Sequence, residues 1–212
     1  MGNDIVDLLA GKTAGKSADP RFVGRVLTEL EKKGMAGTES GDTYLWSLWA
    51  AKETAYKVLS KVYPGIPSWP GKYEVIPDGE VSGGSCTAVV QTPRDPVRVL
   101  LFINRDYIHC IGGVPGKVRP DRIIHGVEKV ASCTGVRAQA RAESAAARGA
   151  AVRSIAACTA LAEPDIEIMR HKENGRLGPP IVYIRGKAAQ IDLSLSHHGR
   201  FAAFAFIRNK EK

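Results

Sequence analysis

Two acids and a lysine near the start of the chain are residue types that bind a metal ion and a phosphate group. Asp4 lies in a short segment, residues 2–9, that reads as a strand, whereas Glu53 and Lys57 lie in a segment with helical spacing, residues 43–62. Residues four apart share one face of a helix, about one turn from each other. Magnesium prefers hard oxygen ligands, usually one or two carboxylates with water and substrate phosphate. This face could therefore offer a carboxylate to a metal and an ammonium to the phosphates that the metal binds.

A plainer interpretation of the same residues stays open. A Glu–Lys pair four apart is a common device on exposed helices and stabilises them by only a few tenths of a kcal/mol. Asp4 alone could be a cap or turn residue. Lys52 precedes Glu53 in the chain and lies about a hundred degrees around the helix from it, so it is a further candidate for a phosphate contact.

A second candidate site lies near the end of the chain, in the segment Asp192-Leu193-Ser194-Leu195-Ser196-His197-His198-Gly199-Arg200. Strand alternation places the leucines on one face and the serines on the other. Ser196 and His197 then lie where the strand ends, and a hydroxyl, an imidazole and an arginine there could hold a phosphate. Neighbouring strand residues point to opposite faces, which argues against a Ser–His nucleophilic pair. A hairpin turn with solvated histidines is the alternative.

Two glycine-containing segments invite comparison with phosphate-binding loops. Residues 11–17 resemble a P-loop, but the first glycine is one position late and Asp19-Pro20 stands where a helix should begin. We therefore expect a basic loop there and no nucleotide hydrolysis. Residues 173–180 are expected to form a turn whose backbone amides could approach a ligand.

The elements that must position these residues form two similar series. The first series is expected to contain a strand at 2–9, helices at 21–33 and 43–62, and strands at 73–76, 86–91, 97–103 and 107–111. The second is expected to contain a helix at 137–161 and strands at 166–170, 181–184, 192–196 and 201–207. A Gly- and Pro-rich segment, 112–120, separates them. The order of elements predicts an α+β fold of two pseudo-equivalent lobes, 1–116 and 117–212, each a helix with a small antiparallel sheet.

The composition of the chain indicates which kinds of molecule it could bind and in which compartment it could act. The 212 residues carry a formal net charge of +8, which favours anionic partners. No base-stacking or zinc-finger pattern supports nucleic acid. The cysteines, which are Cys86, Cys110, Cys133 and Cys158, lack metal-binding spacing and suggest a reduced compartment. No run is apolar enough to span a membrane, and the first residues lack the basic start of a signal peptide, so we expect a cytoplasmic protein.

Taken together, the motifs resemble those of the 4'-phosphopantetheinyl transferase superfamily. That family carries a G-x-D strand, a [FW]-x-x-K-E-[AST]-x-x-K helix and an S-x-S-H strand end. This chain has them as Gly2-Asn3-Asp4, Trp49-Ala50-Ala51-Lys52-Glu53-Thr54-Ala55-Tyr56-Lys57 and Ser194-Leu195-Ser196-His197. The motif order is similar to that of the short holo-acyl-carrier-protein synthases and the reverse of that in the larger monomeric members. The resemblance implies the 4'-phosphopantetheinyl transferase fold in a monomer, with one active site in the cleft between two pseudo-repeats.

The resemblance also implies roles for individual residues. Asp4 and Glu53 would bind Mg²⁺, and Glu53 and Lys57 would be catalytic. The residues that it assigns to coenzyme A or its phosphates are Lys52, Lys57, Arg153, Gly175, Arg176, Ser196 and His197. Where larger members have a second acid two positions after the aspartate, this chain has Val6, and Asp7 should face the other side of the strand.

The activity that the resemblance implies is transfer of 4'-phosphopantetheine from coenzyme A to a serine of an apo acyl or peptidyl carrier protein, with 3',5'-ADP as the other product. Such transfers depend on alignment and on cations that neutralise the phosphoryl oxygens. Glu53, or a water on the metal, would take the serine proton. Acyl carrier proteins are acidic, which suits a basic chain. The alternative is a non-catalytic relative that binds coenzyme A or the carrier without transfer.

Overall fold

The computed structural model describes residues 1–79, 83–173 and 175–208, without the side chains of Glu173 and Arg176. Its first half contains β1 (Gly2–Asp7), α1 (Pro20–Val26), α2 (Glu29–Met35), α3 (Gly41–Ser60), β2 (Glu74–Pro77), β3 (Ser85–Gln91), β4 (Val97–Ile103) and β5 (Tyr107–Gly113). Its second half contains β6 (Ile124–Lys129), α4 (Val136–Thr159), β7 (Ile166–Glu173), β8 (Arg176–Ile184), β9 (Lys187–His198) and β10 (Phe201–Arg208).

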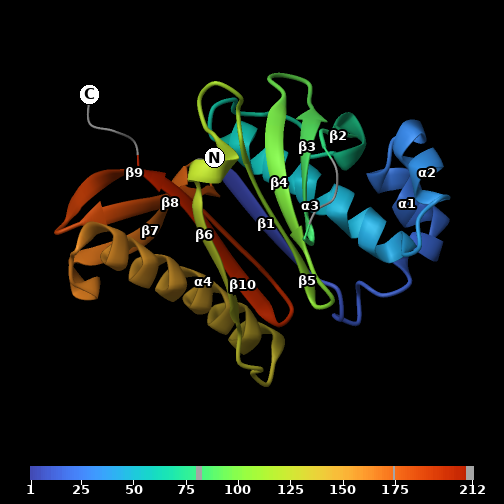
Figure 1. Ribbon diagram of the computed structural model, residues 1–212. Coiled ribbons are helices and arrows are strands. Elements are labelled where there is room, and N and C mark those ends of the chain that lie inside the picture. The colour runs from blue at the N-terminus through green and yellow to red at the C-terminus, as the bar shows by residue number, and fades with distance from the viewer. Residues whose placement is uncertain (80–82, 174, 209–212) are drawn as a thin grey trace.

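The two halves have the same topology. The first sheet has the strand order β1-β5-β4-β3-β2 and the second has the order β6-β10-β9-β8-β7. In each half the first strand pairs with the last, and one long helix follows the first strand and packs on the sheet (Figure 1). The predicted α+β fold of two pseudo-equivalent lobes is therefore confirmed. All strands of the first sheet precede residue 116 in the sequence, and all strands of the second sheet follow it.

Each long helix covers its sheet with a face of small and aliphatic side chains. In α3 this face includes Leu45, Leu48 and Leu59, which belong to the core of the first lobe. In α4 it includes Ala151 and Ile155, which pack with side chains of the second sheet. Burial of these apolar surfaces stabilises each helix against its own sheet, so each lobe has its own core.

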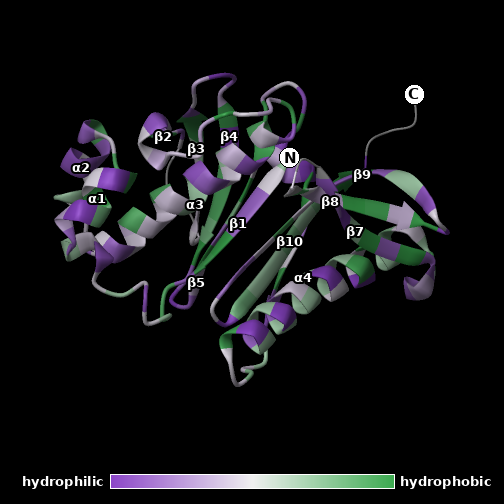
Figure 2. Cartoon of the chain, turned by 180° about the vertical axis from the view of Figure 1, so that it is seen from behind, coloured by the Kyte–Doolittle hydropathy of each residue, from purple (hydrophilic) through white to green (hydrophobic). Residues whose placement is uncertain are grey.

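The strand β1 belongs to the first sheet but also contacts the second lobe. It packs against β9 and β10, and Figure 2 shows it next to β10 between the two long helices. Ile5 lies in an apolar cluster with Phe201 and Ala203 of β10. The backbone N–H of Asn3 donates to Ser194 Oγ at 3.0 Å. Residues of β1 therefore face the first lobe's helix on one side and the second lobe on the other.

Three details differ from the sequence-based expectations. The helix expected at 21–33 is two helices, because Leu27 is extended and Thr28 starts α2 with a capping box that involves Glu31. The turn expected at 173–180 is shorter than predicted: among the described residues Gly175 lies in a turn, whereas those from Arg176 onward form β8. Pro179 and Pro180 fit this strand because the pairing of β8 with β9 begins only at Ile181.

The third difference is β6, a strand that the sequence analysis missed. Its sequence, IHGVEK, has no apolar run and all its residues are partly or fully exposed. Its pairing with β10 makes it the counterpart of β1. Among the described residues, none of the helices has the length and hydropathy that a transmembrane segment requires.

Candidate active site

An ion pair joins β1 to α3. Lys57 Nζ lies 2.7 Å from Asp4 Oδ1 and donates to the backbone oxygen of Asn3 at 3.0 Å. Asp4 is buried. Alternation along β1 turns Asp4 toward the helix. Gly2 turns the same way, and a Cβ added to it would lie 2.6 Å from the Thr54 oxygen. The glycine of the G-x-D motif thus lets α3 approach close enough for Lys57 to reach the aspartate.

Glu53 lies one turn before Lys57 on α3 and is half-buried. Burial, and then the negative charge of Asp4, raise the pKa of Glu53 to about 7, against the opposing effect of Lys57. The two carboxylates are therefore near enough to repel each other. A carboxyl group with a pKa near neutrality can exchange a proton at physiological pH.

The donor set fits magnesium better than zinc. It consists of two carboxylates from different elements, the kind of hard oxygen ligand that magnesium uses together with water and phosphate. In the part of the chain that the structure describes, no group of three or more His, Cys, Asp or Glu side chains is placed to hold a metal ion. A divalent cation would relieve the repulsion that raises the Glu53 pKa. Binding of Mg²⁺ by Asp4 and Glu53 stays a prediction that this geometry permits.

Lys52 does not lie with Lys57, contrary to the expectation that it contacts phosphate. Its side chain is 1% exposed and its Nζ lies 2.6 Å from Glu31 Oε2 and 2.7 Å from the Val26 oxygen. Glu31 also accepts from the backbone N–H groups of Thr28 and Val75, both at 2.8 Å. Lys52 therefore ties α1, α2 and β2 to α3, and its ammonium is not available to a ligand.

Ser196 and His197 point to opposite faces of β9, as strand alternation requires. Ser196 is buried at the junction of the lobes, where its Oγ accepts from Asn3 Nδ2 at 3.0 Å. His197 faces α4, and its Nδ1 lies 2.8 Å from Glu143 Oε2. The structure thus gives Ser196 a structural contact and leaves His197, at 41% exposure, as the accessible member of the motif.

The residues expected at the nucleotide end of coenzyme A are spread over the second lobe. Arg153 of α4 forms an exposed ion pair with Glu128 of β6. Gly175 has a φ of +77° in the turn between β7 and β8. The side chain of Arg176 lies outside the described residues. The ion pair of Arg153 with Glu128 involves none of the residues Asp4, Glu53 and Lys57.

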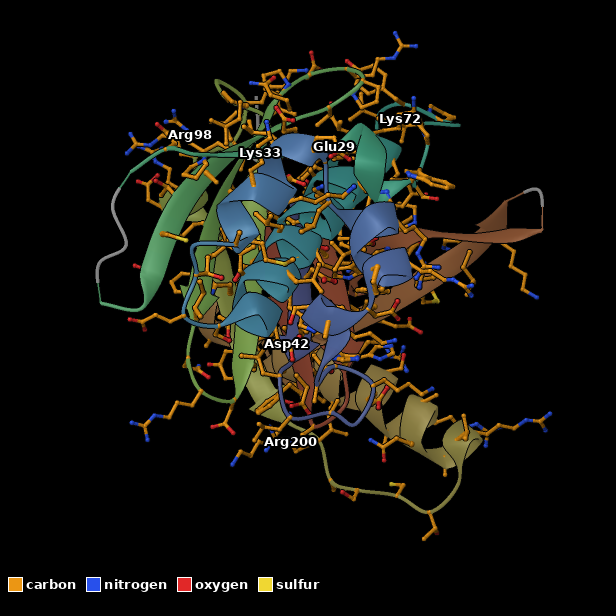
Figure 3. The ribbon with its side chains drawn as sticks, turned by 90° about the vertical axis from the view of Figure 1, so that its right-hand side faces the viewer. Glu29, Lys33, Asp42, Lys72, Arg98 and Arg200 are labelled. Carbon is orange, nitrogen blue, oxygen red and sulfur yellow. The ribbon has the colours of Figure 1, made fainter. Side chains whose placement is uncertain are left out.

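The sequence analysis missed the polar side chains that join the lobes. Asp7 binds Arg200, and Lys61, the residue that follows α3, lies 2.5 Å from Asp192 Oδ1 of β9. Figure 3 shows Arg200 and Asp42 near the loop that follows β1. Asp42 accepts from the N–H groups of Gly15 and Ser17 at 2.6 and 2.7 Å. In the loop that superficially resembles a P-loop, two backbone N–H groups therefore already donate to the Asp42 carboxylate.

Glu143 was also missed. It lies in an Ala- and Arg-rich helix without a recognisable motif, and only the fold places it against His197.

Comparisons with known proteins agree with the motifs. The model of the 4'-phosphopantetheinyl transferase superfamily matches residues 1–109, which include Asp4, Glu53 and Lys57 but not His197. The mitochondrial holo-[acyl-carrier-protein] synthase of Eremothecium gossypii is 36% identical over 56 residues, 26% of this chain. The match covers 32% of that relative, so the chain spans about a third of its length. No solved structure matches the chain significantly.

Proposed function

The chain belongs to the 4'-phosphopantetheinyl transferase superfamily, and on that basis we propose that it transfers 4'-phosphopantetheine from coenzyme A to a serine of an apo acyl or peptidyl carrier protein. The other product is 3',5'-ADP. The family establishes a transferase of the phosphopantetheinyl type, whereas the carrier and the holo-carrier synthase activity belong to the proposal. The observation that carries it is the convergence of Asp4, Glu53 and Lys57 between β1 and α3.

These three side chains match the needs of phosphoryl transfer. Such reactions depend on alignment of the reactants and on positive charge near the phosphoryl oxygens. Asp4 and Glu53 would hold Mg²⁺, which would neutralise the diphosphate of coenzyme A when bound. Lys57 already lies against Asp4 and supplies an ammonium group beside the same position.

The protein's own groups also account for the proton. The hydroxyl oxygen of the carrier serine attacks the phosphorus that bears the pantetheine, and the bond from that phosphorus to the oxygen of 3',5'-ADP breaks. Glu53, or a water on the metal, would accept the hydroxyl proton as a general base. The pKa of about 7 describes Glu53 without a metal ion, and bound Mg²⁺ would lower it and keep the carboxylate ionised. His197 would contribute a phosphate contact from the second lobe.

Charge supports the proposed partners. Coenzyme A carries several phosphate charges and acyl carrier proteins are acidic, whereas this chain has a net charge of +8. Opposite net charge favours encounter with both.

The test is a carrier screen. The purified chain would be incubated with Mg²⁺, coenzyme A and several apo carriers, and each carrier would be weighed by mass spectrometry. We expect one carrier or more to gain the mass of phosphopantetheine, and a much slower gain with Glu53→Gln. Binding of coenzyme A without a mass gain on any carrier would instead identify a non-catalytic relative.

A further inference from the structure

His197 is held by a carboxylate that no motif contains. Its Nδ1 lies 2.8 Å from Glu143 Oε2 on α4. The Glu143 side chain is only 13% exposed, whereas that of His197 is 41% exposed. The carboxylate is therefore the fixed partner, packed against the sheet, and the imidazole is the member that a ligand can reach.

Glu143 is itself oriented by a neighbour on the same helix. Gln139 Nε2 lies 3.1 Å from Glu143 Oε1, one helical turn away. The other end of the Gln139 amide accepts from the backbone N–H of Cys133 at 2.8 Å. This backbone donor determines which end of the amide faces Glu143. A continuous set of hydrogen bonds thus runs from a main-chain N–H through Gln139 and Glu143 to the imidazole.

The contact determines which imidazole nitrogen is left for a ligand. A carboxylate can only accept a hydrogen bond, so Nδ1 must carry the hydrogen that it shares with Glu143. Carboxylates fix the tautomer and orientation of histidines in the same way at metal sites and in catalytic triads. Across the described part of the chain, His197 Nε2 has no hydrogen-bond partner. This nitrogen is therefore the one presented to a ligand.

We propose that Glu143, oriented by Gln139, is a positioning residue that fixes the His197 imidazole with Nδ1–H toward α4 and Nε2 toward a phosphate group of coenzyme A. The inference rests on the proposed function, because that function supplies the ligand. Glu143 does not touch coenzyme A itself. In the neutral form with hydrogen on Nδ1, Nε2 is an acceptor, so the contact with a phosphate oxygen requires the imidazolium form. In that form both ring nitrogens donate, one N–H to Glu143 and the other to the phosphate oxygen.

The first experiment reads the imidazole directly and needs no substrate. Long-range ¹H–¹⁵N correlation spectra of the chain labelled at histidine would report the protonation of each ring nitrogen, with the His197 signals assigned by their absence in His197→Ala. We expect hydrogen on Nδ1 in the wild-type chain and its redistribution between the two nitrogens in Glu143→Ala. Ser144→Ala, the adjacent residue on the same helix, is the control and should leave the spectrum unchanged. An unchanged His197 tautomer in Glu143→Ala would overturn the proposal.

The second experiment separates positioning from simple support of the fold. The Kd of coenzyme A would be measured by calorimetry for the wild-type chain, Glu143→Ala, His197→Ala and the double variant. If Glu143 acts only through His197, Glu143→Ala should weaken coenzyme A binding roughly tenfold in the wild-type chain. The same substitution should have no further effect in the His197→Ala variant. Independent, additive losses would show that Glu143 merely supports the lobe, which contradicts the proposal.

The two experiments also separate this inference from the proposed function. If the wild-type chain does not bind coenzyme A, the phosphate contact fails together with the function, whereas the spectra still decide whether Glu143 orients the imidazole. If coenzyme A binds and the tautomer does not depend on Glu143, the inference fails and the function stands.

Discussion

Asp7 and Arg200 form an ion pair that links the two lobes. Arg200 Nη2 lies 2.7 Å from Asp7 Oδ1, and the backbone N–H and Nε of Arg200 donate to Asp7 Oδ2 at 2.9 and 3.0 Å. Asp7 is the last residue of β1, and Arg200 lies in the turn between β9 and β10. The strand that carries Asp4 is therefore fixed to the strand that carries His197.

Loss of this link should destabilise the fold at neutral pH. We expect Asp7→Asn to lower the free energy of unfolding by about 2 kcal/mol, since hydrogen bonds to a buried charged group are lost. Urea unfolding at pH 7 would measure it. Asp106→Asn is the matched control, because Asp106 is 49% exposed and lies 3.4 Å from Arg200, and it should have little effect.

The same pair predicts a pH dependence. Burial acts to raise the pKa of Asp7, but hydrogen bonds from Arg200 and the Leu9 N–H outweigh it and hold the pKa below its usual 3.8. A carboxyl group with a lowered pKa stabilises the fold above its unfolded pKa and stops doing so as the pH falls through the folded pKa. The stability difference between the wild-type chain and Asp7→Asn should therefore be constant above about pH 5 and shrink below pH 4. A difference that stays the same down to pH 2 would contradict this assignment.

Glu53 should give a pH dependence of stability opposite in sign to that of Asp7. Its pKa is raised from 4.5 to about 7, so the folded state holds a proton that the unfolded state has lost, and stability falls as the pH rises through this interval. Without Mg²⁺, Glu53→Gln should be more stable than the wild-type chain above pH 7, by at most about 3 kcal/mol, and equal to it below pH 4. Thermal unfolding across this pH range would test it. Equal curves at all pH values would show that Glu53 is not perturbed.

Binding of Mg²⁺ should release protons from Glu53. At pH 7 about half of the Glu53 side chains are protonated if the pKa is about 7, and a metal ligand must be ionised. Calorimetry in buffers of different ionisation enthalpy should detect roughly half a proton released per Mg²⁺ bound. Glu53→Asp is the control that keeps a carboxylate. Binding without proton release in the wild-type chain would argue against Glu53 as a ligand.

Removal of either acid or of Lys57 should abolish most transfer. We expect Asp4→Asn, Glu53→Gln and Lys57→Ala to lower kcat by a factor on the order of 100 or more, because charge stabilisation of the phosphoryl group is lost. Circular dichroism would confirm that each variant is folded. Lys32→Ala changes a lysine in an exposed pair with Glu29 and should transfer normally. Near-normal rates in Asp4→Asn or Glu53→Gln would count against the metal assignment.

Lys52 should behave differently from Lys57. Lys52→Met leaves the Glu31 carboxylate buried without its cation, which should cost about 3–5 kcal/mol of stability. The double variant Lys52→Met/Glu31→Gln should recover part of this loss and bind coenzyme A normally. If the double variant were stable but no longer bound coenzyme A, Lys52 would have to contact the ligand after all.

The sequence predicted the fold better than it predicted the second half of the site. Apolar periodicity identified both long helices and most strands because these elements bury one regular face. Asp4, Glu53 and Lys57 could be grouped because two of them share one helical turn and the family motif supplies the third. The contacts of Ser196 and Glu143 could not be predicted, since they depend on which face of β9 meets β1 and which meets α4. Lys52 was misassigned because its buried partner, Glu31, is distant in sequence.

The shared topology of the lobes gives the second lobe a strand position equivalent to that of Asp4. Asp4 pairs with Cys110, the fourth residue of β5. Gly126 pairs with Phe204, which is likewise the fourth residue of β10. Gly126 thus stands where the second lobe would need its aspartate, and a side chain there would meet the Phe204 ring at 2.7 Å. An aromatic ring fills the position that an acid occupies in the first lobe. The chemistry proposed above would therefore fall to the first lobe, and the second lobe would contribute contacts to the substrate.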